Sequence, residues 1–261
     1  MSANSEYQKL RSHLATLRLS AAAEALPGLL DQSRADKLSP TVLLERLLAV
    51  EVEATVARRQ ASLARFACLP APWRIADFDF EAQPAIDPKL VEELATLRFL
   101  DDATNVLFIG PPGVGKTMLA VGLGWEAVQA GYKVHYTTAS DLAARCHRAA
   151  MEGRWATMMR HYANCKLLII DELGYLPLPA EAAAAIFQVV TQRYLKGSIC
   201  LTTNLGIASW GKVFGEDQMV AAAMLDRLLH RSVVFNIDGP SYRMRAHRAR
   251  AEATRKAVAG S

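Results

Sequence analysis

The sequence predicts an α/β fold in which a central parallel five-stranded sheet follows a small all-α N-terminal domain. Three observations support this prediction. Short apolar strands alternate with longer helical stretches from residue 105 onwards, a glycine-rich turn joins the first strand to the first of these helices, and the first 68 residues show helical spacing alone. Strands that alternate with helices are typical of a parallel sheet whose two faces are covered.

The first domain, residues 1–68, is expected to consist of helices. Its first leucines recur at roughly helical spacing, and the pair Pro27-Gly28 is expected to break that pattern. Ser39 is a suitable N-cap for a long helix that begins at Pro40. One face of this helix carries the apolar residues Leu43, Leu44, Leu47, Leu48, Val52 and Val56. Two interpretations stay open for the domain: a small bundle with solvated charges, or a module that binds DNA or a partner.

Residues 69–100 are expected to form a linker arm followed by a lead-in helix. Prolines at positions 70, 72, 84 and 88 interrupt an acidic stretch that contains Phe78 and Phe80, which indicates a domain boundary. A short helix is expected from Pro88 to about Leu100, and it leads into the third segment.

The third segment, residues 101–261, shows the alternating pattern. Strands are expected at residues 106–109, 133–137, 167–170, 198–202 and 232–237, and helices at 116–130, 140–151, 155–163, 180–195 and 218–229. Ser140 is expected to cap the second of these helices. Two helices fit between the second and third strands, where one would be enough, although a single helix kinked at Gly153 would explain the same pattern.

The turn after the first strand matches the phosphate-binding sequence G-x-x-x-x-G-K-[ST], with the required strand before it and helix after it. Glycines let backbone N–H groups approach phosphates, and the helix N-terminus adds partial positive charge. Lys116 is expected to reach the β- and γ-phosphates, and the Thr117 hydroxyl to bind Mg²⁺. The expected nucleotide-binding residues are Gly110, Pro111, Pro112, Gly113, Val114, Gly115, Lys116, Thr117 and Met118.

Acidic and amide side chains follow two later strands, at the end of a parallel sheet where ligands bind. Asp171 and Glu172 come directly after a buried-type strand, and Asn204 follows the next one. We expect Asp171 to hold Mg²⁺ and Glu172 to orient or deprotonate the attacking water. Asn204 is placed to contact the γ-phosphate or that water. This set favours hydrolysis of ATP over phosphoryl transfer to a small molecule.

Three arginines near the end of the chain are further candidates. Arg227 and Arg231 precede the last strand, where an arginine can reach the nucleotide of a neighbouring subunit and stabilise charge in the transition state. The choice between the two stays open, with Arg227 preferred. Arg243 follows the last strand and is placed to contact the nucleotide of its own subunit.

Composition excludes several classes of protein. The 261 residues carry 30 Lys+Arg against 26 Asp+Glu, so net charge alone does not indicate nucleic-acid binding. The four cysteines are scattered without metal-binding spacing, which is typical of free thiols in a reducing compartment. No run approaches the roughly 18 apolar residues of a membrane span, and no signal peptide is recognisable. We therefore expect a cytoplasmic protein that does not contact membranes.

In their order along the chain, these elements resemble the IstB-like ATP-binding proteins, which are helper ATPases of an insertion-sequence transposon family and relatives of the DnaC helicase loader. The resemblance covers nearly the whole chain and is strongest from about residue 75 to 245. It is carried by Gly110–Thr117, Leu167–Glu172, Thr202–Asn204, Asp226–Arg231 and Ser241–Arg243, with Leu97-Arg98-Phe99 in the arm. It implies a P-loop NTPase of the AAA+ type with a reduced C-terminal lid, since only about two dozen residues follow the last strand.

The resemblance also implies roles and partners. The implied roles are Walker residues for Lys116, Thr117, Asp171 and Glu172, sensor 1 for Asn204 and sensor 2 for Arg243. Helper ATPases of this kind oligomerise with ATP, bind and remodel target DNA, and recruit or stimulate a transposase. In the related initiators and loaders an inserted helix between the second and third strands favours open spirals over flat rings. We therefore expect a homo-oligomer in the form of an open spiral or filament.

Basic residues gather in three places where they could meet DNA phosphates. These groups are Arg11, Arg18, Arg58 and Arg59; Arg145, His147, Arg148, Arg154, Arg160 and His161; and Arg243, Arg245, Arg248, Arg250, Arg255 and Lys256. No base-reading motif accompanies them, so DNA binding is expected to be largely independent of sequence.

Three other functions stay open. A DnaC-like loader would deliver a replicative helicase in place of recruiting a transposase. A small-molecule kinase would need an acceptor pocket and a lid, against which the Asp171-Glu172 pair and the short C-terminal segment argue. A binding module would hold ATP without useful hydrolysis, and substitution of Glu172 separates this case from an ATPase.

Overall fold

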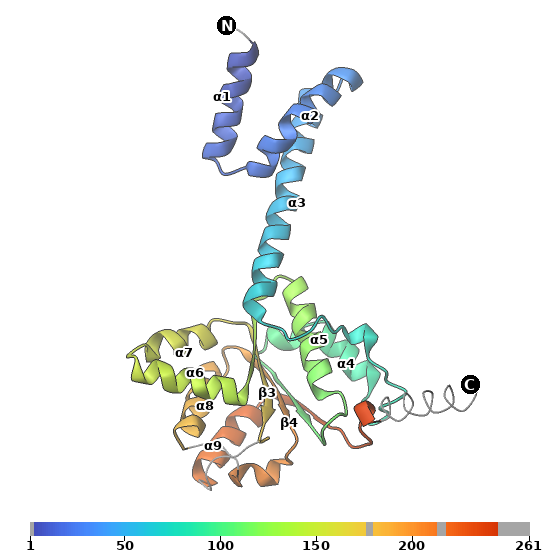
Figure 1. Cartoon of the computed structure of the whole chain (residues 1–261). Coiled ribbons are helices and arrows are strands. Elements are labelled where there is room, and N and C mark those ends of the chain that lie inside the picture. Colours follow the sequence, from blue (N-terminus) through green and yellow to red (C-terminus); the bar gives the residue numbers. More distant parts are fainter. Residues whose placement is uncertain (1–2, 176–179, 213–217, 245–261) are drawn as a thin grey trace, which may run out of the picture. The chain divides into compact units, whose positions relative to one another are not determined.

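The computed structural model describes residues 3–175, 180–212 and 218–244 (Figure 1). The chain folds as two compact units, Met1–Ser62 and Leu63–Ser261. In the described part of the chain, no helix is both long and apolar enough to cross a bilayer.

The first unit is helical, as predicted. It contains α1 (Ala3–Thr16), α2 (Ser20–Asp36) and the first part of α3 (Pro40–Ala67). Its small core consists of Leu14, Ala22, Leu26 and Leu47. The prediction that Pro27-Gly28 breaks the helix is wrong, because Pro27 lies inside α2. Both residues are exposed, while Ala22 and Leu26 bury the opposite side of the helix, so packing offsets the lost backbone hydrogen bond.

Helix α3 begins at the expected place, and the backbone N–H of Val42 donates to Ser39 Oγ at 3.4 Å. Its apolar residues do not all pack. Leu47 is buried, whereas the side chains at Leu44, Leu48, Val52 and Val56 are each at least half exposed. Glu51 is buried instead, and it accepts a hydrogen bond from the backbone N–H of Ala22 at 2.9 Å. Helical periodicity therefore identified the helix but not its packed face.

The second unit contains a five-stranded sheet and the helices that cover it. Its strands are β1 (Asn105–Ile109), β2 (Val134–Thr138), β3 (Leu167–Leu173), β4 (Ser198–Thr203) and β5 (Ser232–Asn236). Its α-helices are α4 (Pro88–Ala95), α5 (Lys116–Gln129), α6 (Ala139–Met151), α7 (Trp155–Ala163), α8 (Ala180–Arg193) and α9 (Gln218–Leu229). Short 3-10 helices span Ile75–Asp77, Arg98–Leu100 and Ile207–Lys212.

The strands lie in the order β2-β3-β4-β1-β5, and every neighbouring pair is parallel, as predicted. Helices α4 and α5 pack with one core cluster against one face of the sheet, and α6 to α9 pack with a second cluster against the other (Figure 1). Because β3, β4 and β1 are parallel neighbours in the sheet, their carboxyl ends lie side by side in its middle.

Several expected boundaries needed correction. The helix that begins at Pro88 ends at Ala95 rather than Leu100, because Leu97 adopts a left-handed backbone with φ of 64° and a 3-10 turn follows. The cap of α6 is Thr138 and not Ser140, since the Thr138 hydroxyl accepts from the backbone N–H of Asp141 at 3.0 Å. Strand β3 continues beyond Ile170 to Leu173.

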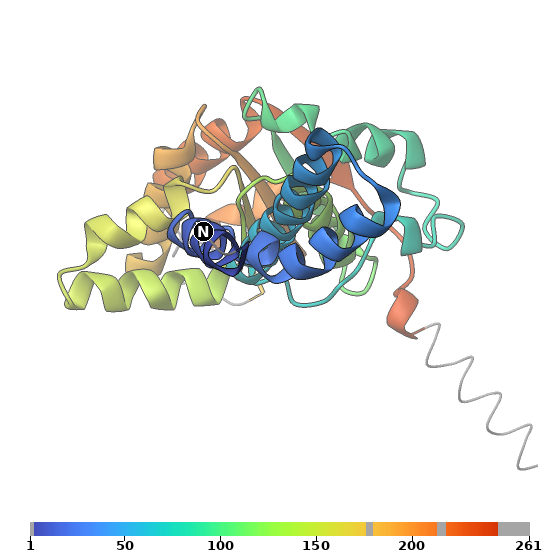
Figure 2. The same cartoon turned by 90° about the horizontal axis from the view of Figure 1, so that it is seen from above.

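The crossover from β2 to β3 contains two separate helices, as one of the two interpretations proposed. Helix α6 ends at Met151, Gly153 turns the chain with φ of 68°, and α7 begins at Trp155. The two helices lie next to each other in yellow-green in Figure 2, and both contact α8.

Candidate functional site

The glycine-rich turn, Gly110–Gly115, leaves the end of β1 and enters α5, whose first residue is Lys116. Gly115 caps the helix with φ of 100°. A Cβ atom at this position would stand 2.5 Å from the ring of Phe78. Only glycine therefore fits a left-handed backbone and so close an aromatic contact.

Lys116 is nearly buried and folds back over the turn. Its Nζ donates to the carbonyl oxygens of Gly110 at 2.7 Å and Pro111 at 2.8 Å. Burial lowers the pKa of Lys116. The charge of Asp171 opposes this lowering, whereas the charge of Arg243 strengthens it. The ammonium group thus lies among carbonyl dipoles that a phosphate could replace.

Asp171 is a buried carboxylate at the end of β3 that accepts hydrogen bonds from three hydroxyl groups. Thr117 donates to Oδ1 at 3.1 Å, Thr202 of β4 donates to the same oxygen, and Tyr136 of β2 donates to Oδ2 at 2.7 Å. Burial and the neighbouring Asp171 raise the pKa of Tyr136, so its hydroxyl stays a donor. Neither Tyr136 nor Thr202 was a predicted site residue.

Glu172 lies in a bulge of β3. The pairing between β3 and β4 shifts between Ile170 and Leu173, and Glu172 has φ of 61°. Its backbone N–H donates to Thr202 Oγ1 at 3.0 Å, which leaves the exposed side chain outside the sheet. A positive φ is uncommon for glutamate, and strained backbone of this kind clusters at functional sites.

Asn204 follows β4, at the same end of the sheet. Its Oδ1 is buried and has no hydrogen-bond partner within the described residues. A buried acceptor left without a partner is costly, so a ligand or water that donates to it would be favourable.

The arm before the sheet and the segment after it both close onto the turn. Gln83 Nε2 donates to the carbonyl oxygen of Val114 at 3.3 Å, and Phe78 covers Gly115. From the other side, the backbone N–H of Tyr242 donates to the carbonyl oxygen of Gly113 at 2.9 Å. Residues far apart in the sequence therefore build one wall around the glycine-rich turn.

These segments enclose a cavity of about 440 Å³, here named the P-loop cavity. Of the predicted residues, those that line it are Gly113, Val114, Gly115, Lys116, Thr117, Met118 and Arg243. Gly110, Pro111 and Pro112 do not line it, although Gly110 and Pro111 hold Lys116. Lining residues that were not predicted are Trp73, Asp77, Phe78, Asp79, Ala82, Gln83 and Tyr242. The acidic and aromatic composition of the arm was visible, but nothing in the sequence placed it beside the turn.

Arg227 and Arg231 lie away from the P-loop cavity of their own chain. Arg227 is half-buried on α9, where it donates to the carbonyl oxygen of Ala223 at 2.7 Å and lies 4.9 Å from the ring of Phe187. Arg231 is exposed and reaches the carbonyl oxygen of Asp102 at 3.3 Å. The basic tail residues Arg245, Arg248, Arg250, Arg255 and Lys256 lie outside the described residues.

The comparison with known families matches residues 12–251 to a model described as IstB-like ATP binding protein. The chain belongs to the IstB-like family. Among its relatives, the ATP-binding protein of insertion sequence IS5376 from Geobacillus stearothermophilus is 40% identical over 94% of this chain and 97% of its own length. The ATP-binding protein of insertion sequence IS21 from Pseudomonas aeruginosa is 40% identical over 90% of this chain and 88% of its own length.

The fold of the IstB-like chain is similar to those of several solved structures. Replication initiator DnaA bound to AMPPCP and single-stranded DNA has a TM-score of 0.56 at 21% identity, over 66% of this chain and 51% of the DnaA chain. DnaI has a TM-score of 0.52 at 16% identity, over 64% of this chain and 91% of its own. The IstB-like chain thus has the P-loop NTPase fold that the sequence predicted, and these distant likenesses show the fold alone.

Proposed function

We propose that this IstB-like protein binds ATP with Mg²⁺, hydrolyses it, and serves as a DNA-binding helper in transposition. One observation carries the proposal: the glycine-rich turn, the buried Asp171 and the bulged Glu172 meet at the carboxyl end of the sheet, beside a cavity large enough for a nucleotide. The names of the relatives, all ATP-binding proteins of insertion sequences, support both ATP and the transposition context.

The phosphates fit the turn at the start of α5. The last residues of the turn and the first residues of α5 line the P-loop cavity, so the positive end of this helix would attract the phosphates. Lys116 would exchange its bonds to Gly110 and Pro111 for bonds to phosphate oxygens. Arg243, which already lowers the pKa of Lys116, would add a second cation to the same phosphates.

The oxygen atoms of Thr117 and Asp171 fit Mg²⁺, which prefers hard oxygen ligands. Within the described residues, no three His, Cys, Asp or Glu side chains gather to bind a metal, so phosphate oxygens and water would complete the site. Bound there, Mg²⁺ would neutralise charge that develops on the phosphates. Glu172 would accept a proton from the attacking water, and Asn204 Oδ1 would hold that water by accepting a hydrogen bond.

The aromatic side chains that line the P-loop cavity would fit the adenine base. Trp73, Phe78 and Tyr242 line this cavity beside Gln83, whose Oε1 has no partner within the described residues. A flat heteroaromatic ring packs well on such side chains, and an amide oxygen can accept from an amino group. The arm of residues 69–88 would thus help to hold ATP.

A transposition helper acts on DNA and on a transposase. We propose that ATP promotes binding to both by driving the protein to oligomerise. An arginine that precedes β5 would reach the nucleotide of a neighbouring subunit, and we favour Arg231 because Arg227 is already packed on Phe187. Gel shift of duplex DNA, with and without ATP, tests the proposal. Equal binding by a monomer in both conditions would contradict ATP-driven assembly.

A pair of substitutions separates ATP binding from hydrolysis. Lys116→Ala should weaken binding of a fluorescent ATP analogue at least about tenfold, because one charge-assisted contact to phosphate is lost. Glu172→Gln should keep that binding, lose turnover and hold the protein in its DNA-bound assembly. Undiminished hydrolysis by Glu172→Gln would remove this residue from the reaction and favour a protein that only binds ATP.

A further inference from the structure

One residue of β4, Thr202, lies opposite two residues of β3, Asp171 and Glu172, because the pairing of these strands shifts at this point. Two residues opposite one form a β-bulge, and bulges beside active sites re-aim a side chain. Thr202 is buried, whereas the side chain of Glu172 is exposed. The position of the Glu172 carboxylate therefore depends on what holds the bulge.

The Thr202 hydroxyl joins the two bulge residues to each other. It accepts a hydrogen bond from the backbone N–H of Glu172 at 3.0 Å and donates its own proton to Asp171 Oδ1. The direction of both bonds is fixed, because an amide N–H only donates and an ionised carboxylate only accepts. A hydroxyl that donates to a charged group is a stronger acceptor, so the charge of Asp171 strengthens the bond to Glu172.

The backbone on both sides of Glu172 is held by β4. Before the bulge the two strands pair in regular register, and after it Thr203 Oγ1 donates to the carbonyl oxygen of Leu173 at 2.7 Å. Glu172 itself has φ of 61°, which a residue other than glycine keeps only when neighbouring contacts hold it there. Without the Thr202 hydroxyl, the N–H of Glu172 would lose its acceptor, and this backbone would relax toward a commoner conformation.

We propose that Thr202 is a positioning residue for Glu172 in ATP hydrolysis. This inference rests on the proposed function, in which Glu172 accepts a proton from the attacking water. In this role the Thr202 hydroxyl acts through the backbone of Glu172. It would keep the carboxylate that activates water in a fixed position relative to Asp171, the carboxylate that would hold Mg²⁺.

Steady-state ATP hydrolysis by the full chain at saturating Mg²⁺ tests the proposal. Thr202→Val keeps the shape of the side chain but removes the hydroxyl, so kcat should fall about 10- to 100-fold because the base is misplaced. Binding of a fluorescent ATP analogue should stay within about twofold of the wild type, since the lost interaction belongs to the reaction step. Thr202→Ser restores the hydroxyl and should retain most of the wild-type kcat.

A double variant distinguishes an effect on Glu172 from an effect on the metal site. Residues that act as a unit give losses that do not add. In the Glu172→Gln background, Thr202→Val should therefore lower the residual single-turnover rate by less than about twofold. A hydroxyl that acted only through Asp171 would instead cause its full loss in both backgrounds.

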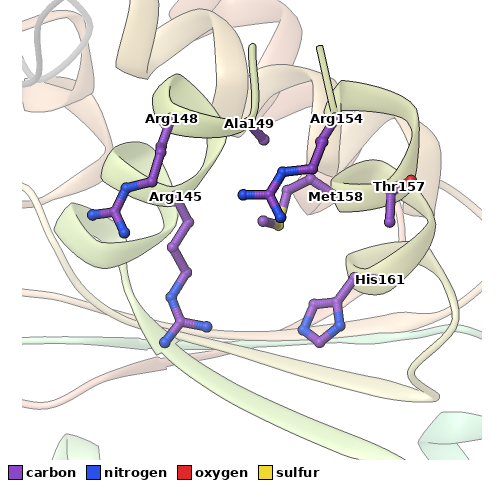
Figure 3. A pocket seen from close by; sticks show the side chains of 7 residues that line it. All are labelled: Arg145, Arg148, Ala149, Arg154, Thr157, Met158 and His161. Atoms are coloured by element: carbon purple, nitrogen blue, oxygen red, sulfur yellow. The ribbon is translucent and has the colours of Figure 1, made fainter. Parts of the chain in front are cut away.

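Ser198→Ala and Thr157→Val are the controls. Ser198 is buried at the opposite end of β4, where its hydroxyl donates to the carbonyl oxygen of Phe99 at 3.3 Å. Thr157 lines a separate cavity of about 300 Å³ between α6 and α7, which shares no lining residue with the P-loop cavity (Figure 3). Both variants should keep kcat within about twofold of the wild type, because distant sites act independently.

A wild-type kcat in Thr202→Val, or a Thr202→Ser variant as slow as Thr202→Val, would overturn the inference and leave the proposed function intact. Additive losses in the double variant, or an equal loss of kcat in Ser198→Ala, would do the same. Absence of turnover in the wild type, or undiminished hydrolysis by Glu172→Gln, would overturn the proposed function and the inference with it. Should thermal unfolding show that Thr202→Val does not fold, Thr202→Cys takes its place, because a thiol is only a weak donor and acceptor.

Discussion

At the residue scale, the carboxylate of Asp171 is held before any ligand arrives. Hydroxyl groups of Thr117, Thr202 and Tyr136 come from α5, β4 and β2, so three elements fix one side chain. Of these donors, Thr117 would turn to Mg²⁺ in the proposed reaction, while Thr202 and Tyr136 would remain. In that reaction Tyr136 would be a positioning residue for Asp171 rather than a catalytic one.

Tyr136→Phe tests this role. The substitution removes the 2.7 Å hydrogen bond to Asp171 Oδ2 and leaves that buried oxygen without its donor. Since a hydrogen bond to a charged group contributes about 1.5–3 kcal/mol, ATP turnover at limiting Mg²⁺ should fall roughly 10- to 100-fold. ATPase rate as a function of Mg²⁺ concentration is the measurement, and excess Mg²⁺ should recover part of the rate.

Tyr132→Phe is the matched control, because Tyr132 follows α5 and does not line the P-loop cavity. If Tyr136→Phe lost activity equally at every Mg²⁺ concentration, or if its thermal stability fell in parallel, Tyr136 would support the fold rather than the metal site.

Sequence reasoning located those parts of the proposed site that directly follow a predicted strand. The glycine-rich turn, Asp171, Glu172 and Asn204 lie at one end of the sheet because parallel strands share that end. Tyr136 and Thr202 could not be found in this way. Their approach to Asp171 depends on strand order, which places β3 between β2 and β4, and the spacing of motifs does not determine that order.

At the scale of elements, the end of α8 is tied to the sheet by a buried arginine. Arg193 donates to the carbonyl oxygens of Tyr162 at 2.6 Å, Cys165 at 2.8 Å and Ser198 at 2.7 Å. These carbonyls lie at the end of α7, before β3 and at the start of β4. The guanidinium group thus satisfies backbone acceptors that the helix and strands leave unpaired.

Arg193→Ala should lower the free energy of unfolding by at least about 3 kcal/mol, because each buried carbonyl left without a donor costs about 1–3 kcal/mol. Urea unfolding followed by tryptophan fluorescence measures the change. Lys196→Ala removes a positive charge from an exposed position three residues later and should have little effect. Similar losses in both variants would show that Arg193 acts through net charge and not through these carbonyls.

In the first unit, Glu51 joins α3 to α2, and we expect this contact to depend on pH. The backbone N–H of Ala22 is the main cause that lowers the pKa of Glu51, and Arg58, whose Nη2 lies 2.6 Å from the carboxylate, adds to it. A folded-state pKa below the ordinary value of 4.5 means that the stabilisation is present above that value. It is lost as pH falls through the lowered folded-state pKa.

Hydrogen exchange of the α2 amides in the full chain tests this linkage. Glu51→Gln should reduce protection of α2 at neutral pH, and its difference from the wild type should vanish at pH values below the lowered pKa. The exposed Glu53 on the same helix provides the control substitution, Glu53→Gln. A difference between Glu51→Gln and the wild type that persists unchanged into strong acid would exclude ionisation of Glu51 as its cause.

The element boundaries that sequence reasoning misplaced share a physical reason. Pro27 stays inside α2 and Leu97 ends α4 early, because packing of neighbouring side chains outweighs local propensity at both places. In α3, apolar spacing marked one face, but burial of Glu51 shows that the contact with α2 decides which side is covered. Apolar spacing predicts that a segment is helical, but it does not show which face of the helix packs against a neighbouring helix.

At the scale of the whole molecule, the proposed reaction would draw on a residue of a neighbouring subunit. Arg243 lines the P-loop cavity, whereas Arg227 and Arg231 lie elsewhere. An arginine that completes the site from a neighbouring subunit would make hydrolysis depend on assembly, with a contribution of about three to five powers of ten in rate. Among the described residues no aromatic ring packs on the exposed Arg231, whereas Phe187 packs on Arg227, so Arg231 is the better candidate for this role.

Mixing two inactive variants tests whether Arg231 acts between subunits. Arg231→Ala and Glu172→Gln should each lose ATP turnover while they still bind ATP. In a mixed assembly, an intact Glu172 of one subunit can meet an intact Arg231 of its neighbour, so an equal mixture should recover about a quarter of wild-type turnover. The same mixture with Arg227→Ala in place of Arg231→Ala distinguishes the two arginines. No recovery with either arginine variant, in assemblies that still form with ATP, would mean that both act within their own chain or only support its fold.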